Sequence, residues 1–479
     1  MPVIRLSQSL GSVALLVFST LSSAQADKAD VVSSLNSDYE RYQSIAEALW
    51  SSPELGYLEV ESTRLLQSAL EEEGFSLEKG VAGMPTAFTA TYGTSGPIIG
   101  ILGEYDALPG MSQAAVPYEE PMLDGAPGQA CGHHLFGTAS LAAAIAVKNW
   151  LVDSGTPGTI RYYGTPAEEG GSGKVYMVRA GLFNDVDAVI SWHAGDANTA
   201  NPGTNLATIS GKFRFSGRSS HAAAAPERGR SALDGVEAMN DMVNMLREHT
   251  TEPTRIHYVI TDGGNAPNIV PKTAEVYYVI RHEDVDEVRS VWDRVVRTAE
   301  GAAIGTETEM EYEIIGGTYP RLPNETLAGV LHSNLSMVGG VEYSEDDVAF
   351  AREIQGTLPG QLPAIESAGE VQPMVFTKGK ASADTGDVSW NVPMAAMRAA
   401  TWVPGTPAHS WQAVAAGGTA IGYKGMMVAA KTLALSAMDL YKKPEMLKKA
   451  KSEFDDRTGP EFRYSALLGD RAPALDYRR

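Results

Sequence analysis

The sequence predicts an α/β protein: a domain with a mostly parallel sheet and flanking helices, interrupted by an inserted α+β domain. Two observations predict it. Short apolar runs alternate with helical patterns up to about residue 205, which is typical of parallel strands joined by helices. From there to about residue 318, strands of alternating polar and apolar residues surround two longer helical stretches. We expect the first domain to comprise 27–205 and 321–479, and the insertion 206–320.

The first 26 residues have the pattern of a secretory signal peptide. Arg5 precedes a short apolar run from Val13 to Leu21, and small residues flank Gln25 at the expected cleavage site. An N-terminal helix of the mature protein is the alternative. We therefore expect 1–26 to be removed and the chain to be periplasmic or secreted. The remaining part, of about 450 residues, has the length of two or three domains.

The composition and charge limit the classes of partner that this protein can bind. The chain of 479 residues carries a formal net charge of −21, which disfavours nucleic acids and anionic membranes because both would be repelled. The hydrophobic content of 43% is ample for large cores. Beyond the signal, no run approaches the ~20 apolar residues of a membrane span. The single cysteine, Cys131, cannot form an intramolecular disulfide, and such residues are usually buried.

Local patterns predict the elements of the first domain in chain order. Helices are assigned from a three-to-four spacing of apolar residues and strands from short apolar runs bounded by turn residues. The elements are a helical region at 31–74, a strand at 97–103, a loop at 111–130, a helix at 135–152 and strands at 159–164 and 186–192.

The same reasoning covers the insertion and the end of the chain. Alternating residues predict half-buried strands at 212–215 and 274–279, and helical patterns occupy 229–249 and 284–302. After residue 323 the helical pattern resumes, and we expect the last compact helix to end near residue 441. The charged segment that follows has only weak patterning.

Candidate metal ligands follow three of these predicted elements. Functional side chains collect at the carboxyl ends of parallel strands. Thiolate, imidazole and carboxylate are the ligand types of zinc and related divalent ions. Each residue alone has a structural interpretation, but the combination indicates a metal site. The candidates are Cys131, His133, Glu168, Glu169 and His193, with His409 farther along the chain.

The adjacent glutamates suit metal-assisted hydrolysis. One carboxylate can hold the ion while its neighbour takes a proton from the water that the ion activates. A nucleophilic Cys131 with a histidine base is the alternative, but it leaves the glutamate pair without a role. The glycine-rich segment 170–175 is not a phosphate loop, because it lacks the first glycine and Val175 replaces the hydroxyl residue.

Several motifs agree in order and spacing with one enzyme family. Together they resemble the amidohydrolase subfamily of the M20 metallopeptidases, in the branch of the aminobenzoyl-glutamate hydrolases, over about residues 40–440. The motifs that carry this resemblance are 104–109, 130–133, 166–174, 191–193, 384–390, 405–411 and 424–426.

The resemblance implies a catalytic α/β domain that carries two divalent metal ions, Mn²⁺ or Zn²⁺. It also implies a lid domain that mediates homodimer or heterodimer formation. Glu168 would be the general base and then the acid towards the leaving amine. By matched position, the metal ligands would be Cys131, His133, Glu169, His193 and His409.

Further roles come from the same resemblance. Asp106 would orient a ligand histidine. From the lid, His221 would reach the partner's active site and stabilise the oxyanion, while Asn268 and Arg281 would contact substrate. A guanidinium such as that of Arg281 suits a carboxylate. His134 stands where relatives usually carry Asp or Asn; we favour a supporting or structural role over a ligand.

We therefore expect an enzyme that hydrolyses N-acyl or N-aroyl amino acids, with p-aminobenzoyl-glutamate as the named candidate. A dipeptidase, carboxypeptidase or N-acyl-amino-acid deacylase of the same family is the nearest alternative. A poorly active subunit of a heteromeric hydrolase and a binding module for anionic metabolites are further alternatives. The intact Glu168 and its neighbouring ligand candidates disfavour both, since neither protein would need them.

Overall fold

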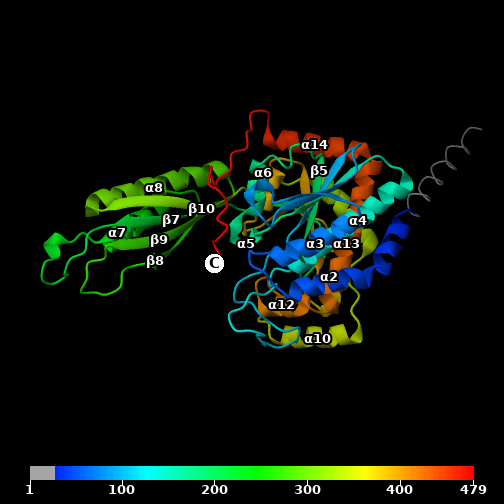
Figure 1. Cartoon of the computed structure of the whole chain (residues 1–479), viewed down its shortest axis with the longest axis horizontal. Helices are drawn as coiled ribbons and strands as arrows, with labels where there is room; N and C mark the ends of the chain where they lie inside the picture. Colours follow the sequence, from blue (N-terminus) through cyan, green and yellow to red (C-terminus); the bar gives the residue numbers. More distant parts are fainter. Residues whose placement is uncertain (1–26, 479) are drawn as a thin grey trace, which may run out of the picture.

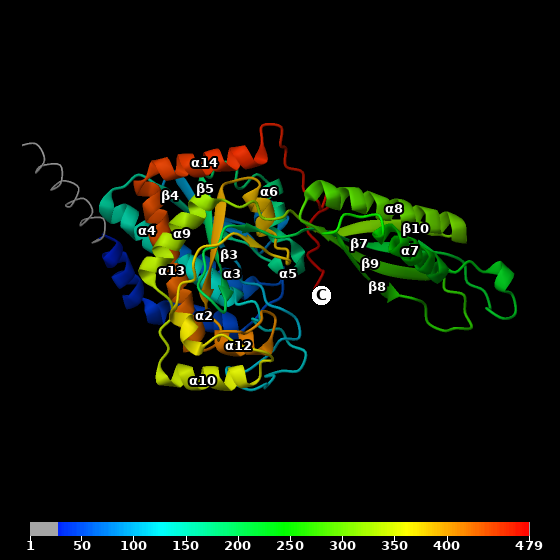
Figure 2. The same cartoon turned by 180° about the vertical axis from the view of Figure 1, so that it is seen from behind.

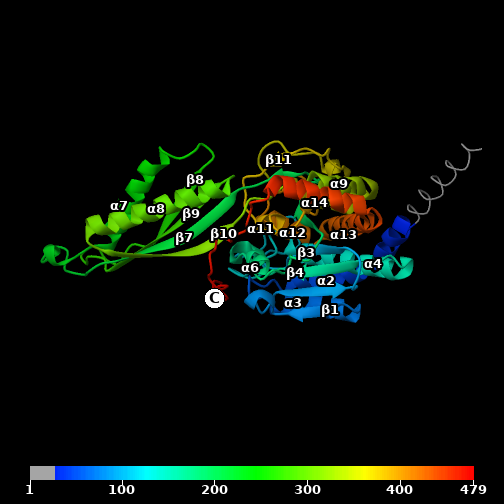
Figure 3. The ribbon, with the colours of Figure 1, turned by 90° about the horizontal axis from the view of Figure 1, so that it is seen from above.

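Two lobes of different architecture make up this computed structural model, which describes residues 27–478. The predicted signal peptide, 1–26, lies outside the described residues. Figures 1 and 3, which view the molecule at right angles, both show the smaller lobe extending from one side of the larger one. We call the larger lobe the catalytic domain and the smaller one the lid, the names that the family resemblance implies.

A six-stranded sheet forms the centre of the catalytic domain, in the order β1-β2-β4-β3-β5-β12. The strands β4, β3, β5 and β12 run parallel, and β1 and β2 join them in antiparallel pairs. The predicted mostly parallel sheet is confirmed. Its strands are β1 (Ser76–Lys79), β2 (Phe88–Tyr92), β3 (Ile98–Gly103), β4 (Thr159–Gly164), β5 (Ala188–Gly195) and β12 (Met394–Ala400).

Helices of the catalytic domain flank this sheet, and residues 27–37 are also helical. The longest ones pack around β5: α4 lies against β3, β4 and β5, and α13 lies against α4, β5 and β12. The helices are α2 (Tyr39–Ser51), α3 (Val60–Glu72), α4 (His133–Ser154), α5 (Glu168–Gly171), α6 (Gly173–Arg179), α9 (Glu325–Val338), α10 (Glu345–Gly356), α11 (Thr385–Ser389), α12 (Trp411–Gly417), α13 (Ala420–Lys442) and α14 (Pro444–Thr458).

The helix α4 is apolar around its whole circumference because it lies inside the domain. By length and composition alone it could cross a membrane, but 83% of its most apolar window is buried within the protein. A helix that is apolar on all sides and buried in a folded domain is a core helix. Its first residue, His133, therefore starts from a rigid, buried position.

The lid is a four-stranded antiparallel sheet, β10-β7-β9-β8, with α7 and α8 packed on it. The alternation predicted for the insertion is visible in β9, where every second residue is buried. Phe213, Tyr278 and Trp292 lie in the lid's own core. The predicted inserted α+β fold is confirmed. The elements are β7 (Ala207–Ser216), α7 (Ala232–Arg247), β8 (Arg255–Asp262), β9 (Thr273–His282), α8 (Val285–Thr306) and β10 (Glu309–Thr318).

Minor elements complete the described chain. A two-stranded parallel sheet joins β6 (Gly203–Thr204) to β11 (Thr377–Lys378). Short 3-10 helices span Val81–Gly83, Pro226–Arg228 and Ile365–Gly369.

The helical region predicted at 31–74 consists of separate helices. Between α2 and α3 the chain leaves the helix at Pro53, whose ring disfavours helical geometry in the residue before it. The carboxylate of Glu54 then accepts hydrogen bonds from the backbone N–H groups of Glu61 and Ser62, at the start of α3. No apolar residue lies between Trp50 and Leu55, so the apolar spacing is interrupted here, and Pro53 was a turn signal that the prediction of one helical region did not use.

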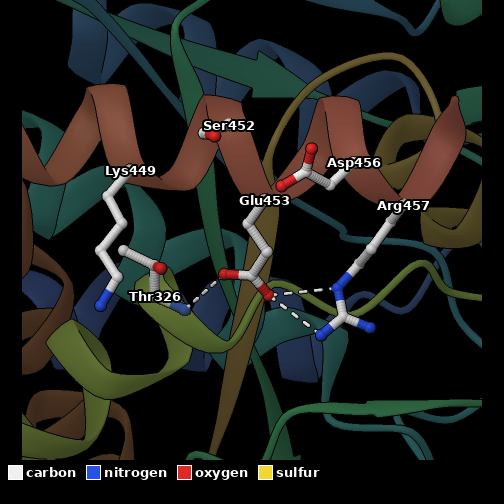
Figure 4. Close-up of a pocket in the computed structure, with 6 residues that line it drawn as sticks. All are labelled: Thr326, Lys449, Ser452, Glu453, Asp456 and Arg457. Carbon is white, nitrogen blue, oxygen red and sulfur yellow. Dashed lines mark hydrogen bonds and ion pairs between the residues drawn. The ribbon is translucent and has the colours of Figure 1, made fainter. Parts of the chain in front are cut away.

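The helix α14 was missed by the sequence reasoning. Only Leu447 and Ala450 are buried along it, so its apolar pattern is weak. Its position depends on Glu453, whose carboxylate accepts hydrogen bonds from Glu325 N at 2.6 Å and Thr326 N at 3.0 Å, at the start of α9. Figure 2 shows α14 beside α9 and α13. Glu453 is one of the residues that line a hollow of about 440 Å³ at this junction, and Figure 4 shows its carboxylate between Thr326 and Arg457.

Candidate metal centre

The predicted ligands come together where several chain segments meet. Cys131 and His133 flank the start of α4, His193 lies in β5, and Glu168 and Glu169 follow β4. Gly132 allows the sharp entry into α4: its φ is 76°, and a Cβ there would lie 2.5 Å from the side chain of Ala194.

His409 reaches the same place from the loop before α12. Its φ of 59° is unusual for a residue with a side chain, and its N–H donates to the Ala130 carbonyl at 3.0 Å. Its imidazole Nε2 lies 3.1 Å from Glu169 Oε1. The loop therefore holds a distant histidine against the Cys131 segment.

Three groups of possible ligand atoms each lie within 4.8 Å of one another. Cys131 belongs to two of them, so a single thiolate can face two ion positions. The groups are Cys131, His133 and His193; Cys131, Glu169 and His409; and His133, Glu168 and Glu169.

The donor atoms fit divalent ions. Thiolate, imidazole and carboxylate are suitable ligands for Zn²⁺, and carboxylate and imidazole also suit Mn²⁺. His133 Nε2 and Glu169 Oε1 make no hydrogen bond among residues 27–478; each has only an ion-pair contact of 3.1 Å, to Glu104 and His409 respectively. Buried polar atoms are nearly always satisfied, and a bound ion would supply these two atoms with a partner. His193 Nδ1 contacts the Ala194 carbonyl at 2.9 Å, which leaves Nε2 to face Cys131.

The electrostatics of the cluster favour a thiolate. Burial opposes ionisation of Cys131, but the neighbouring His133 and His193 outweigh it and hold the pKa of the thiol well below its usual range. The thiolate is the form of cysteine that binds metal.

Asp106 joins two parts of the cluster. Its Oδ1 lies 3.0 Å from His133 Nδ1, and its Oδ2 accepts a hydrogen bond from Glu169 N at 2.9 Å. Burial opposes its ionisation, but the charge of His133 outweighs this and lowers the pKa of Asp106. With Nδ1 held in this way, His133 directs Nε2 towards the cluster.

Glu168 has the properties of a proton-transfer group. Burial raises its pKa well above the usual range, and the carboxylates of Glu104 and Glu169 raise it further. A carboxyl group that holds a proton more strongly than usual can take one from water and later release it to a leaving amine.

A buried ionic network supports Glu168, and the sequence reasoning did not identify it. Lys174 is fully buried, and its Nζ lies 2.7 Å from Glu104 Oε1 and 2.8 Å from Asp384 Oδ1. Glu104 Oε2 in turn lies 3.1 Å from His133 Nε2. The three residues lay within recognised motifs, but nothing local showed that they would meet.

Glu59 is a second missed residue. Its carboxylate accepts hydrogen bonds from Ala167 N at 2.8 Å and Thr86 Oγ1 at 2.9 Å. Burial raises the pKa of Glu59 to about 8. It fixes the residue before the glutamate pair, where Ala167 has a φ of 55°. No sequence signal marked it.

His134 points away from the cluster. Its Nε2 lies 3.0 Å from the Gly417 carbonyl in α12, and burial lowers its pKa to about 3. A neutral imidazole in this position joins α4 to α12, which is the structural role favoured over a ligand.

The lid residues lie apart from the candidate ligands. His221 is exposed, and its Nδ1 accepts hydrogen bonds from Ala223 N and Ala224 N, both at 3.2 Å. Asn268 is also exposed, whereas Arg281 donates to Ser382 Oγ at 3.2 Å. Within residues 27–478, no hydrogen bond or ion pair joins these three side chains to the metal-ligand cluster.

Comparison with known proteins decides the family. Residues 206–307 match the peptidase dimerisation domain of the M20 family. The chain is 42% identical over 455 residues to one of the subunits of p-aminobenzoyl-glutamate hydrolase from Escherichia coli, a match that covers 88% of this chain and 94% of the relative. The chain belongs to the M20 peptidase family. It is therefore an enzyme that acts on amide bonds.

Other M20 relatives and solved structures agree. A mouse (Mus musculus) Xaa-Arg dipeptidase is 28% identical, over 87% of this chain and 89% of the relative. An aminobenzoyl-glutamate utilization protein from Klebsiella pneumoniae superposes with a TM-score of 0.62 at 19% identity, covering 85% and 97% of the two chains. A dinuclear metal-binding M20 peptidase from Bacillus subtilis gives 0.57 at 18%, covering 85% and 99%. These structures support the two-domain fold.

Proposed function

We propose that this M20 enzyme hydrolyses the amide bond of N-acyl or N-aroyl amino acids, with p-aminobenzoyl-glutamate as the first candidate substrate. The observation that carries the reaction is the cluster in which Cys131 is shared by two ligand groups beside Glu168. The choice of substrate rests on the relative at 42% identity, which is a p-aminobenzoyl-glutamate hydrolase subunit.

The proposed ligands are five of the six residues in the cluster, all except Glu168, and the proposed ions are Mn²⁺ or Zn²⁺. When bound, two such ions would polarise the substrate carbonyl and lower the pKa of the attacking water. Glu168 accepts the proton of that water and returns it to the leaving nitrogen. Asp106 keeps His133 and the backbone of Glu169 in place during both steps. The proposed ligands are Cys131, His133, Glu169, His193 and His409, all of which belong to groups that could hold an ion.

The lid would complete the site across a dimer. His221 would stabilise the oxyanion of the partner's substrate, and Asn268 and Arg281 would bind the substrate carboxylate. The separation of these side chains from the ligands of their own chain supports this arrangement. The partner is a second copy or a related chain, because a second p-aminobenzoyl-glutamate hydrolase subunit of Escherichia coli is 28% identical over 59% of this chain and 66% of its own length.

A dipeptidase is the second candidate, because the mouse Xaa-Arg dipeptidase matches over most of its length. The same experiment separates the two. The metal-stripped enzyme, reloaded with Mn²⁺ or Zn²⁺, is assayed on p-aminobenzoyl-glutamate, N-acyl amino acids and Xaa-Arg dipeptides. Turnover of the aroyl or acyl substrates alone supports the proposal, while turnover of dipeptides alone would replace it with the second candidate.

We also propose that the enzyme is exported. The order of charged, apolar and small residues in 1–26 supports this. Fractionation of cells that express the full chain, with N-terminal sequencing of the product, tests it. Cytoplasmic protein that retains 1–26 would contradict export.

A further inference from the structure

The turn that carries the two glutamates has an irregular backbone. Ala167, Gly170 and Ser172 all have positive φ, at 55°, 94° and 59°. Such conformations are costly for residues with side chains and persist only when the surroundings impose them. The start of the turn is held by Glu59 and Asp106, through Ala167 N and Glu169 N. The middle of the turn is held at the carbonyl group of Glu169, by side chains from the end of the described chain.

That contact comes from more than three hundred residues away in the sequence. The carbonyl oxygen of Glu169 accepts hydrogen bonds from Tyr477 Oη at 3.0 Å and from Arg478 Nη2 at 2.7 Å. The second has a charged donor, which makes it among the stronger hydrogen bonds in proteins. The guanidinium of Arg478 also lies 4.9 Å from the Tyr477 ring centre, so the two side chains support each other.

Tyr477 also contacts the other end of the same turn indirectly, through Tyr57, which binds Gly171. Its ring meets that of Tyr57 edge to face, with 5.6 Å between centres, and Tyr57 Oη donates to the Gly171 carbonyl at 2.7 Å. A Cβ on Gly56 would lie 2.2 Å from Tyr477 Oη, so the glycine leaves room for this hydroxyl.

The segment 459–478, which ends in these residues, is anchored along its course between the two domains (Figure 1). Leu467 and Leu468 are buried. Arg471 donates to the Ile315 carbonyl of β10 at 2.7 Å, and its own carbonyl accepts from Arg179 of α6 at 2.7 Å. Contacts to both domains therefore fix where Tyr477 and Arg478 lie.

We infer that Tyr477 and Arg478 are positioning residues for catalysis: they hold the turn so that Glu168 and Glu169 face the cluster. They act through the main chain of Glu169, not through the reacting atoms. This inference rests on the proposed function for its kinetic part. It predicts that weakening the Glu169 carbonyl contact loosens the turn, weakens metal binding and lowers turnover together.

The test uses the full chain with Tyr477→Phe, Arg478→Met and the double substitution. Tyr477→Phe removes one donor and keeps the ring. Arg478→Lys keeps a charged donor, so it is expected to retain more activity than Arg478→Met. Asp470→Asn, on an exposed position of the same segment, is the matched control and is expected to behave as the wild type.

Three readouts follow. In the metal-free protein, amide hydrogen exchange across 167–173 is expected to accelerate in the double variant. Metal affinity, measured by chelator competition, is expected to fall about tenfold, the size typical for partners that support a ligand. In the metal-loaded enzyme, kcat is expected to fall by a similar factor while KM stays unchanged. The first two readouts need no turnover, so a wrong substrate assignment leaves them decisive.

Two results would overturn the inference. Wild-type exchange, metal affinity and kcat in the double variant would show that the contact does not position the turn. A rise in KM alone would show instead that Arg478, whose Nε is buried without a hydrogen-bond partner among residues 27–478, contacts the substrate directly.

Discussion

Glu168 and Glu169 are adjacent in sequence but differ in surroundings. Glu169 faces His409, and its backbone N–H is bound by Asp106. Burial raises the pKa of both carboxyl groups, but Glu104 raises that of Glu168 further, whereas the contact with His409 opposes the rise at Glu169. Two carboxylates in such different environments can perform two functions, one as a ligand and the other as a base.

The first prediction concerns Glu168. Glu168→Gln keeps the shape of the side chain and removes its ability to accept a proton. We expect kcat to fall by at least about a thousandfold, within the range of general-base contributions, while bound metal per chain stays unchanged. Steady-state kinetics and metal analysis of the purified variant check this. Near-normal turnover, or loss of metal, would remove Glu168 from the role of base.

A second prediction concerns the buried lysine. Lys174→Met leaves the carboxylates of Glu104 and Asp384 buried without their cation. Breaking a buried pair in this way costs about 3–5 kcal/mol. We expect the free energy of unfolding in urea to fall by that amount. The control is Arg64→Met, whose partner Glu61 is equally exposed, and it should change stability by less than about 1 kcal/mol. Equal effects would mean that Lys174 is not integral to the network.

These residues show which parts of the site the sequence could predict. The candidate ligands are recognisable because each lies in a short motif near a strand or helix end. The contact between Lys174 and Asp384 joins positions 210 residues apart, so no local pattern predicts it. Glu59 and Tyr477 likewise act on the glutamate turn from a distance. Neither side chain stands in a recognisable motif, and only the fold brings them to the site.

At the scale of elements, predictability depended on how much apolar surface an element buries. Elements with a continuous buried face were found: β9 (Thr273–His282) contains the predicted strand 274–279, and α13 ends at Lys442, near the predicted end at residue 441. The helix α14 buries two residues and is fixed mainly by Glu453, so periodicity could not reveal it. The break between α2 and α3 was missed for a different reason: the helical patterns on its two sides were read as one region although Pro53 separates them.

The short helix α11 carries a pH-sensitive contact between elements. Asp387 accepts hydrogen bonds from Tyr464 Oη at 2.7 Å and Tyr319 N at 3.0 Å, and burial raises its pKa to about 7. Asp384 is the other charged group that raises it. The folded protein therefore keeps a proton at this site over a pH range in which the unfolded chain has lost it.

The third prediction follows from that difference. The folded state binds the extra proton between about pH 4 and 7, so Asp387 lowers stability as pH rises through this range and has no further effect above it. The total is at most about 4 kcal/mol. Asp387→Asn cannot ionise, so its free energy of unfolding should decline less than that of the wild type between pH 5 and 8. Urea unfolding at both values, with Asp470→Asn as control, measures this; parallel declines would contradict it.

At the scale of the whole molecule, the lid presents its candidate catalytic side chain away from its own cluster. His221 and Asn268 are exposed, and the dimerisation match covers the part of the chain that carries both. A symmetric dimer would give each active site a base from one chain and a histidine from the other. The inserted domain could be predicted from the change in strand pattern, but this division between chains could only come from the family resemblance.

The last prediction tests that division. His221→Ala alone should lower kcat by about a hundredfold or more, as expected for an oxyanion donor, and leave metal content unchanged. A hybrid of Glu168→Gln and His221→Ala chains contains one site with both intact residues. If the homodimer reassociates at random from equal amounts, half of the dimers are hybrids with one working site of two, so about a quarter of the wild-type rate should return.

The matched control replaces the His221→Ala chain by a chain with both substitutions. The hybrid of this double variant with Glu168→Gln has no intact site, so mixing should restore nothing. Native mass spectrometry confirms that hybrids have formed in each mixture. Hybrids that form without recovery of activity would place His221 outside the partner's site, because each chain would then depend on its own histidine or on none. If activity recovers in the first mixture and not in the control mixture, each active site must contain residues from two chains.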